Sequence, residues 1–448
     1  MPFLKHDRIT PAHVVILCFL FQILIGACLL SLPVATQSGE RVPFLDALFT
    51  ATSATCVTGL VIHDTALFWS PFGQGVILLL IQVGGMGVVT MAVAIFMFSG
   101  RKIGLKQRWV MQESISAPQV GGIVRMTGFI LKTAFLIEAI GALLLALRFC
   151  PQFGLGKGIW YGIFHAVSAF CNAGFDLMGE TGAFSSLTGY VGDPLVNLVI
   201  CLLIVVGGLG FLTWHDVAAH GRHVSQYRLQ SKLILLTTLA LLVGGFLFFR
   251  FYEFSRPQWV ALTGGEQGLA ALFQSVSPRT AGFNTVDLTQ LSACSQLMTI
   301  LLMLAGGSPG STAGGFKTTT LAVLLLSVGA VIRRQGSARC FGRRLPDQVL
   351  RNACAIFLLY LLLFLAGGML ICCMDEIPLM QALFEAASAI GTVGLSLGAT
   401  AEASEASRLI LIFLMYFGRV GGLTMIYAMA AGSNGSSSQY PQEQVTVG

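Results

Sequence analysis

The chain has 448 residues, and its 26 Lys and Arg with its 20 Asp and Glu make up only 10%, against roughly 25% in soluble globular proteins. Hydrophobic residues account for 55%, and several stretches of 18 or more residues carry no charge, as in membrane-spanning helices. This composition excludes a soluble enzyme, a nucleic-acid-binding protein and a disulfide-rich secreted module. The 52 glycines are costly inside helices and therefore indicate special backbone sites.

In chain order, the apolar stretches predict eight membrane-crossing segments. These segments are 11–35, 72–98, 127–148, 194–214, 232–252, 294–332 (interrupted), 352–374 and 407–431. Four shorter, mildly apolar stretches lie between them, at 44–55, 160–171, 268–278 and 380–390. Each is too short to span a hydrocarbon core about 30 Å thick, so we expect four re-entrant half-helices. The predicted fold class is an all-α integral membrane protein.

The short stretches share the motif F-x-[AS]-x-S. The motif begins at Phe49, Phe164, Phe273 and Phe384. A glycine follows each copy by five or six residues, at Gly59, Gly174, Gly282 and Gly394. A double glycine follows in the next helix, at Gly84-Gly85, Gly207-Gly208, Gly306-Gly307 and Gly421-Gly422. Spacings of 115, 108 and 112 residues between the motif glycines predict four repeats, each a helix, a re-entrant half-helix, a loop and a second helix.

The predicted repeats are consecutive along the chain. They cover 1–100, 101–220, 221–335 and 336–431, and a polar tail at 432–448 follows. Two crossings in each repeat give all four the same orientation, so they can surround a pseudo-four-fold pore along the membrane normal.

Basic residues are unevenly distributed along the chain. Sixteen of the 26 Lys and Arg lie in 1–8, 101–125, 222–232 and 333–351. The positive-inside rule assigns these stretches to the cytoplasm, so both termini are expected inside. Such short basic stretches face anionic lipid headgroups and require no nucleic-acid partner.

Four loops at 55–59, 171–174, 279–282 and 391–394 carry the motif glycines, and we call them glycine loops 1 to 4. Non-helical backbone at membrane depth is tolerated only inside the protein or along a water-filled cavity. Loops around one axis would present rings of carbonyl oxygens, which can replace the water shell of a monovalent cation. The loops contain no carboxylate, the group that a divalent ion usually demands. Alternatively, the glycines only cap helices or allow close packing.

The residues that we expect to bind the ion all lie in the glycine loops. They are Thr55, Cys56, Val57, Thr58, Gly59, Asn172, Ala173, Gly174, Thr280, Ala281, Gly282, Thr392, Val393 and Gly394. No metal site apart from these K⁺-binding positions is predicted, and no catalytic residue.

The four-fold motif, with Thr392-Val393-Gly394 in its last copy, resembles the Trk/Ktr/HKT superfamily of potassium transporters over nearly the whole chain. Eight spans without two additional N-terminal ones are most similar to the Ktr type and its KtrB subunit. The resemblance implies a pore-forming potassium uptake protein of the inner (plasma) membrane. It implies K⁺ as the transported ion, Na⁺ dependence in many members and no organic cofactor in this chain. It also implies a homodimer on a cytosolic ring of KtrA-type regulatory subunits that bind nucleotide.

Residues 305–318 contain five glycines and a proline, which cannot continue an α-helix. The sixth span is therefore predicted to consist of two half-helices joined by a loop. The family resemblance assigns this loop, with an arginine of the last span, to an intramembrane gate. The gate would lie below the selectivity filter that the glycine loops form in this family. The predicted gate residues are Gly306, Gly307, Ser308, Pro309, Gly310, Ser311, Thr312, Ala313, Gly314, Gly315, Lys317 and Arg419.

Arg419 lies in the middle of the last predicted span. An arginine at membrane depth costs at least about 2.5 kcal/mol, so it is expected to face a pore or a partner. The resemblance implies that it contacts the gate loop and adds an electrostatic barrier. For Lys317, the alternative is that its side chain only snorkels, with the ammonium group extended toward the cytoplasm.

Two other function classes stay open. Residues 310–318 partly match a phosphate-binding P-loop, which would indicate a membrane-embedded ATPase, but Phe316 separates Lys317 from the preceding glycine. A sodium- or proton-coupled carrier would need intramembrane carboxylates, and Glu138 is one of the few candidates. The parallel repeats argue against a carrier.

Three aspartates follow glycine loops 1 to 3, namely Asp64, Asp176 and Asp287. We expect them either to concentrate cations at an outer vestibule or only to cap helices.

Overall fold

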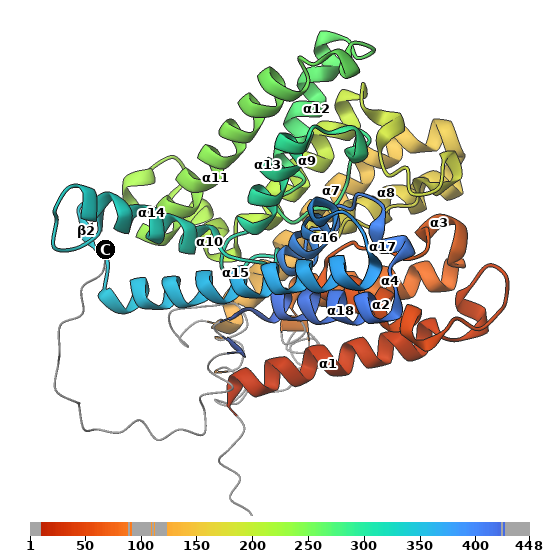
Figure 1. Cartoon of the computed structure of the whole chain (residues 1–448), viewed down its shortest axis with the longest axis horizontal. Helices are drawn as coiled ribbons and strands as arrows, with labels where there is room; N and C mark the ends of the chain where they lie inside the picture. Colours follow the sequence, from red (N-terminus) through yellow and green to blue (C-terminus); the bar gives the residue numbers. More distant parts are fainter. Residues whose placement is uncertain are drawn as a thin grey trace, which may run out of the picture.

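The computed structural model describes residues 10–87, 90–91, 109, 112, 123–422 and 424–425. Within these ranges the chain is mostly helical, as the composition predicts (Figure 1). The N-terminal half contains α1 (Pro11–Leu30), α2 (Phe44–Cys56), α3 (Thr65–Phe68), α4 (Pro71–Met86), α7 (Ile123–Phe153), α8 (Leu155–Phe170), α9 (Pro194–Gly208) and α10 (Phe211–His220). The C-terminal half contains α11 (Leu229–Phe248), α12 (Gly264–Val276), α13 (Ala293–Leu304), α14 (Thr318–Ile332), α15 (Asp347–Asp375), α16 (Leu379–Gly391), α17 (Ala399–Glu402) and α18 (Glu405–Val420).

Shorter elements join these helices. One π-turn, Phe249–Glu253, extends α11. Short 3-10 turns lie at Pro33–Ala35, Met178–Thr181, Thr188–Tyr190, Val224–Gln226, Pro257–Trp259 and Leu288–Gln290. A two-stranded antiparallel hairpin of β1 (Arg339–Cys340) and β2 (Arg343–Arg344) joins α14 to α15.

Four helices of the described part are long and apolar enough to cross a membrane. They are Pro11–Leu30, Ile123–Phe153, Leu229–Glu253 and Asp347–Asp375. They coincide with the first, third, fifth and seventh predicted spans. The other predicted spans contain shorter helices, so length and composition support four of the eight crossings directly, or five if α9 and α10 count as one bent span.

Each predicted half-helix is found next to one of these long helices. Helix α2 packs on α1, α8 on α7, α12 on α11 and α16 on α15. Helix α12 begins at a start signal that the sequence provides, because Thr263 forms a capping box with Glu266 before it. The motif phenylalanines are fully or almost fully buried, at 0–1% exposure, so they anchor the half-helices in the core.

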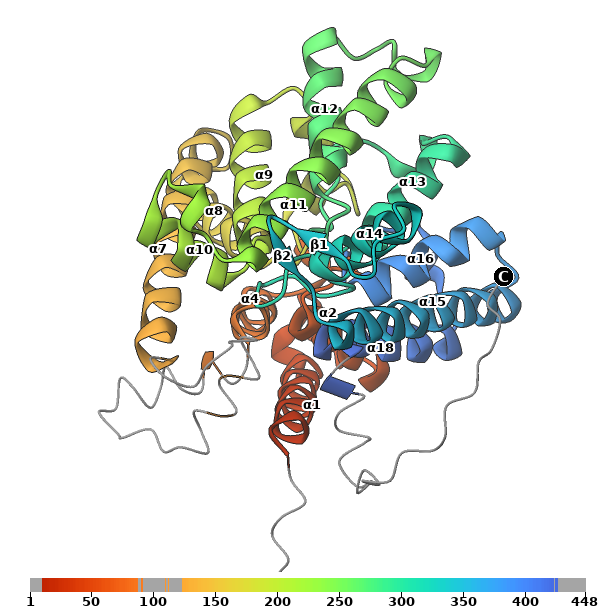
Figure 2. The same ribbon diagram turned by 90° about the vertical axis from the view of Figure 1, so that its left-hand side faces the viewer.

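A second set of contacts joins the four predicted repeats in a cycle. Helix α4 packs on α8, α9 on α12, α13 on α16, and α18 on α2. Each second helix thus contacts the half-helix of the next repeat, and the last contact returns to the first repeat. Figure 2 shows the groups as four sectors, coloured red (α1, α2, α4), orange to yellow (α7–α9), green (α11–α13) and blue (α15–α18).

The second helices differ from prediction in two ways. The predicted span 194–214 contains a sharp bend, because α9 ends at Gly208 and α10 departs at 97°. The turn is possible because Gly210 has φ +89°, in the left-handed region that favours glycine. Helices α4 and α18 end in the same way, at Gly87 (φ +87°) and Gly421 (φ +90°).

The double glycines also align differently from the prediction. A methyl group on Gly84, Gly207 or Gly418 would lie 2.0–2.2 Å from a half-helix carbonyl, that of Thr55, Phe170 or Ile390 respectively. Each of these carbonyls lies four residues before a loop glycine. The equivalent of Gly84 in the fourth repeat is therefore Gly418, three residues before Gly421. The pattern shared by three repeats is G-x-x-G, which places the first glycine against a half-helix and the second at the helix end.

Several predicted features lie outside the described residues. They are the basic stretch 1–8, most of 101–125, the ends of the spans 72–98 and 407–431, and the tail 432–448. The locations of the termini and the repeat boundaries stay predictions.

Candidate functional site

The glycine loops share one backbone conformation although their side chains differ. The residue two positions before each loop glycine is left-handed. These residues are Val57 (φ +57°), Asn172 (+60°), Thr280 (+74°) and Thr392 (+50°). The loop glycines follow with φ of +92°, +70°, +84° and +95°. Positive φ is uncommon for residues with a side chain, so its recurrence at one position in all four loops indicates that the loop geometry is required.

The serine that ends each F-x-[AS]-x-S motif holds its loop in this conformation. Its carbonyl oxygen accepts a hydrogen bond of 2.7–2.9 Å from the residue before the loop glycine, in all four copies. These donors are the backbone N–H groups of Thr58, Ala173, Ala281 and Val393. This hydrogen bond ties each loop to the end of its half-helix, which favours a fixed site.

The serine hydroxyls fall into two pairs. Those of Ser53 and Ser388 accept from the N–H groups of Gly59 (3.1 Å) and Gly394 (3.0 Å). Those of Ser168 and Ser277 donate to the carbonyls of Phe175 (2.7 Å) and Phe283. The sequence prediction used these serines as motif letters and did not assign them to the site. Their presence in every copy was the available signal.

The four loop glycines face one another in a closed cycle. A methyl group on Gly59 would lie 2.4 Å from the Ala173 carbonyl oxygen, and one on Gly174 would lie 2.7 Å from that of Ala281. A methyl group on Gly282 would lie 2.4 Å from the Val393 oxygen. The cycle closes because one on Gly394 would lie 2.2 Å from the Thr58 oxygen. No residue larger than glycine fits at these four positions without moving the backbone of its neighbour.

The remaining loop residues surround this cycle. Thr55 and Cys56 are the last residues of α2, and the Thr55 carbonyl faces Gly84. The side chains of Asn172 and Thr280 lie 3.0 Å apart and join loops 2 and 3. All the predicted ion-binding residues therefore gather at the C-terminal ends of four half-helices, where the partial negative charge of the helix dipoles favours a cation.

The 305–318 segment lies against the glycine loops. It is non-helical from Ala305 to Lys317, as predicted, with α13 ending before it and α14 beginning at Thr318. The Thr312 hydroxyl donates to the Phe170 carbonyl at 3.1 Å. A methyl group on Gly314 would lie 2.1 Å from the Thr392 hydroxyl oxygen. The segment thus touches the bases of loops 2 and 4.

Other backbone groups of the segment bond to the neighbouring second helix. Ser308 N–H donates to the Gly208 carbonyl at 3.0 Å, and Phe211 N–H donates to the Gly310 carbonyl at 2.7 Å. These contacts satisfy groups that the broken helix leaves without partners. A helix, not a strand, precedes the segment, so the context that a P-loop needs is absent there.

Arg419 joins the segment to the end of α4. Its guanidinium donates to the Thr312 carbonyl, the Gly84 carbonyl and, at 2.9 Å, the Gly85 carbonyl. Helix-terminal carbonyls carry partial negative charge, so they suit a guanidinium. In the G-x-x-G pattern Arg419 occupies the position that Gly85 and Gly208 hold in two other repeats. Gly85 itself leaves no room for a side chain, because a methyl group there would lie 2.6 Å from the Cys171 sulfur.

Lys317 is turned toward its own segment. Its ammonium donates to the carbonyls of Ala313 (2.8 Å) and Gly314 (3.2 Å). Its charge is thus bound within the loop that contacts the glycine loops, rather than extended away from it.

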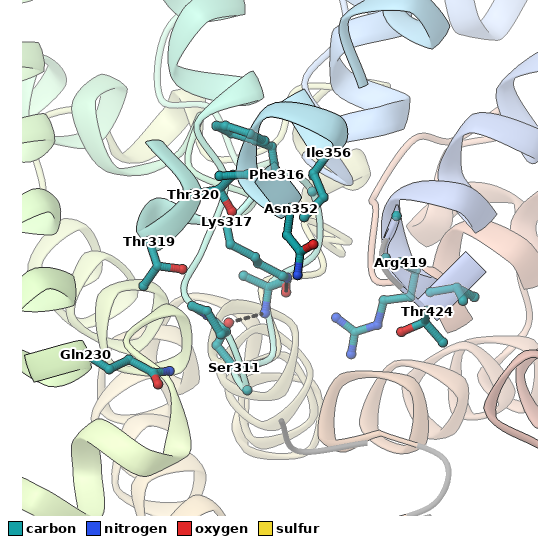
Figure 3. A pocket seen from close by; sticks show the side chains of 18 of the residues that line it. Gln230, Ser311, Phe316, Lys317, Thr319, Thr320, Asn352, Ile356, Arg419 and Thr424 are labelled. Atoms are coloured by element: carbon teal, nitrogen blue, oxygen red, sulfur yellow. Dashed lines mark hydrogen bonds between the residues drawn. The ribbon is translucent and has the colours of Figure 1, made fainter. Parts of the chain in front are cut away.

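The 305–318 segment lines a cavity of about 570 Å³ (Figure 3). Polar groups of Gln230, Ser311 and Asn352 line it between apolar walls from α1, α11, α14 and α15. Among the described residues that line it, the charged ones are Lys317 and Arg419, both basic. The 305–318 segment therefore lies between the glycine loops and a cavity whose charged lining residues are both basic.

The aspartates after the loops mainly cap short turns. Asp64 accepts from the N–H groups that open α3 and from Phe184 N–H at 2.8 Å. Asp176, two residues after Gly174, accepts from Met178 N–H at 3.0 Å. Burial, together with the nearby charge of Asp64, raises the pKa of Asp176 to about 7, although the Met178 N–H opposes the shift.

Comparison with known proteins adds a further finding. The family model TrkH, described as a cation transport protein, matches residues 21–440. The chain is 40% identical over 446 residues to the Ktr system potassium uptake protein B of Bacillus subtilis, covering 99% of this chain and 98% of that protein. It is 39% identical over 447 residues to the potassium/sodium uptake protein NtpJ of Enterococcus hirae, covering 98% of both. Its fold is similar to the crystal structure of the potassium transporter TrkH from Vibrio parahaemolyticus, with a TM-score of 0.72, 20% identity and coverage of 94% of this chain and 85% of that one.

Proposed function

Since the chain belongs to the TrkH family of cation transport proteins and is a multi-pass membrane protein, we propose that it is the pore-forming subunit of a potassium uptake system. The observation that carries this proposal is the closed cycle of the four loop glycines and the carbonyls before them. Two full-length relatives at about 40% identity, both named as potassium uptake proteins, support K⁺ as the ion.

In this proposal the glycine loops form a selectivity filter. Carbonyl oxygens of the four loops replace the hydration shell of K⁺, while the half-helix ends supply a negative potential. The loops contain no carboxylates, so they bind divalent ions weakly. Neutral carbonyl ligands also hold a monovalent ion weakly enough to release it. Glycine is required at the four positions because any side chain there would collide with a filter carbonyl.

The predicted architecture belongs to the proposal as well. Four repeats in one orientation, with eight crossings in the plasma membrane and both termini in the cytoplasm, would place the cavity on the cytoplasmic side. The uneven distribution of basic residues supports this orientation. K⁺ would then enter through the glycine loops, driven by the membrane potential, and leave through the cavity.

The 305–318 segment acts as the gate in this proposal. It lies between the glycine loops and the cavity, and it carries Lys317 while Arg419 holds it in place. Two positive charges on the ion path oppose the passage of K⁺. Opening would require the Arg419–Thr312 contact to break and the segment to move aside.

The names of the relatives suggest two further features. NtpJ is named as a potassium/sodium uptake protein, so we propose that Na⁺ supports transport here too. The Ktr proteins are named as parts of a system, so we propose a homodimer controlled by a cytosolic, nucleotide-binding ring of KtrA type.

Uptake in a bacterium that lacks its own potassium uptake systems tests the filter. Gly59→Ser is compared with the parent and with Gly75→Ser, a control at a position where an added methyl group meets nothing within 4 Å. We expect Gly59→Ser to lose K⁺ preference over Na⁺ by about tenfold or more, since a clash with a carbonyl costs roughly 1–3 kcal/mol. An unchanged K⁺ affinity and ion preference in Gly59→Ser would overturn the filter assignment.

A further inference from the structure

A carboxyl group lies buried near the middle of α7. Glu138 is only 5% exposed and sits within the 31-residue helix Ile123–Phe153, one of the four long apolar helices. None of the ion pairs formed among the described residues includes Glu138. A carboxyl at this depth is expensive, so it is expected to serve a function rather than stability.

Glu138 contacts two side chains from other helices. Both of its oxygens accept from the Gln82 side-chain amide, at 3.0 and 3.1 Å. The Cys171 sulfur lies 3.9 Å from one of these oxygens and 4.0 Å from the Gln82 side-chain oxygen. The cluster of Gln82, Glu138 and Cys171 therefore joins α4 of the first repeat to α7 and the end of α8 in the second.

One side of the cluster leads to glycine loop 2. Cys171 is the residue that ends α8, and the left-handed Asn172 follows it. A methyl group on Gly85 would lie 2.6 Å from the Cys171 sulfur, so α4 packs on this cysteine without spare room. A shift of Cys171 would move the start of the loop that carries the Ala173 carbonyl.

The other side leads to the gate arginine. Gln82 lies less than one helical turn before Gly84 and Gly85, whose carbonyls accept from Arg419. Arg419 also holds Thr312 of the 305–318 segment. The end of α4 is thus the shared support of loop 2 and of the segment.

Glu138 has no acidic counterpart at the equivalent positions of the other repeats. Glu138 lies 36 residues before its loop glycine, and the residues at that distance in the other repeats are Ile23, Phe246 and Leu358. The four-fold architecture alone therefore does not explain an acid here.

We propose that Glu138 is a positioning residue that fixes glycine loop 2 against the end of α4 and thereby determines ion preference. The inference rests on the proposed function as a potassium pore. Because the carboxyl bonds both the helix that supports Arg419 and the helix that starts loop 2, its loss lets the two move apart. The Ala173 carbonyl would then no longer keep its place in the cycle, and smaller or differently hydrated ions would be excluded less strictly.

The test uses the full chain in liposomes and measures ⁸⁶Rb⁺ flux with increasing Na⁺ as competitor. Glu138→Leu removes both contacts, whereas Glu138→Gln keeps an acceptor for Gln82. We expect the ratio of Na⁺ to Rb⁺ needed for half-inhibition to fall by about tenfold in Glu138→Leu and by less than about twofold in Glu138→Gln, since one buried hydrogen-bonded group is lost only in the former.

Glu253→Gln provides a matched control. Glu253 is another buried acid, bonded to Ser292 (2.6 Å), Ser295 (2.7 Å) and Trp259 (3.0 Å) outside the cluster. We expect this variant to lower thermal stability without changing ion preference. A Glu138→Leu protein that loses stability but keeps the parent preference would overturn the inference.

If Glu138→Leu does not fold, Gln82→Leu removes the same contact from the opposite helix. A parent-like preference in folded Gln82→Leu would overturn the inference equally. Failure of the proposed function gives a different result, because the parent chain itself would then show no ⁸⁶Rb⁺ flux.

Discussion

The glycine loops and the second helices below them follow different rules. Each of the four loops has a left-handed residue at the same position, followed by the loop glycine, and each is bonded to the serine that ends its motif. In three repeats the second helix places the first glycine of its G-x-x-G pattern against a half-helix carbonyl, whereas in the third repeat the helix ends at Leu304 and the 305–318 segment follows. The part that would surround the ion is therefore symmetric, whereas the part that would control its exit is not. A gate needs one movable element, while carbonyl coordination needs all four loops.

Arg419 marks the second asymmetry. It takes the position that is glycine in two other repeats. Its side chain reaches the C-terminal end of α4, where it bonds to the carbonyls of Gly84 and Gly85. The third repeat thus supplies the 305–318 segment, and the fourth supplies the arginine that bonds to it. The first repeat supplies the Gly84 and Gly85 carbonyls that accept from the same arginine.

The largest effect is expected from breaking the symmetric region. Gly394→Ala adds a methyl group 2.2 Å from the Thr58 carbonyl oxygen, at a residue with φ +95°. We expect K⁺ uptake to fall by about 100-fold, because the clash and the backbone strain each cost roughly 1–3 kcal/mol. Uptake at equal amounts of membrane-inserted protein measures this loss.

Gly398→Ala separates the two causes. Gly398 has φ +97°, but an added methyl group meets nothing within 4 Å, so this variant carries only the backbone strain. Equal losses in both variants would mean that strain, and not the cycle of carbonyls, explains the requirement for glycine.

A smaller effect is expected from breaking the asymmetric region. Arg419→Ala removes the hydrogen bonds to Thr312, Gly84 and Gly85. It also removes one positive charge from the lining of the cavity. Hydrogen bonds to a charged group contribute about 1.5–3 kcal/mol, so we expect K⁺ flux in the absence of any regulatory partner to rise by about tenfold. Flux of ⁸⁶Rb⁺ into liposomes measures it.

Arg408→Ala is the matched control on the same helix. Arg408 pairs with Asp46 at 2.7 Å near the opposite end of α18, away from the segment. An increase in flux of similar size in both variants would show that loosening α18 is enough, and the proposed role of Arg419 would be lost. Arg419→Lys is expected to fall between them, because one ammonium cannot reproduce the fork of a guanidinium.

The sequence predicted the repeated features and missed those that depend on packing between repeats. The motif spacing located all four half-helices, and the glycines of 305–318 located the break in the sixth span. The equivalence of Gly418 with Gly84 was missed, because double glycines are visible in the sequence whereas contact with a half-helix carbonyl is not. The 97° bend at Gly210 was missed for a similar reason, since glycines in an apolar run are also compatible with close packing of a continuous helix.

Glu138 shows the same limit from another side. The sequence marks it as a polar residue in an apolar helix, but its partners Gln82 and Cys171 lie 56 and 33 residues away on other elements. No periodicity relates the three residues. The packing of both α4 and α7 on α8 brings them together.

The smallest effect concerns the entrance to the symmetric region. The pKa of Asp176 is raised to about 7, so its carboxyl is mostly neutral at pH 6 and mostly ionised at pH 8. If it faces incoming cations, the KM for K⁺ should fall as the external pH rises through 7. The change should be about twofold, because a single partly solvated charge contributes under about 1 kcal/mol.

Asp287 is the control for this pH effect, because its pKa is lowered whereas that of Asp176 is raised. Burial alone would raise its pKa, but hydrogen bonds from Thr289 and Gln290 outweigh burial and hold the pKa below its usual value. Asp287 therefore stays ionised between pH 6 and 8, and Asp287→Asn should shift the KM equally at both values. Asp176→Asn should instead abolish the pH dependence and keep the KM of pH 6. A pH dependence that survives in Asp176→Asn would assign the titration to another group, and Asp176 would then only cap its turn.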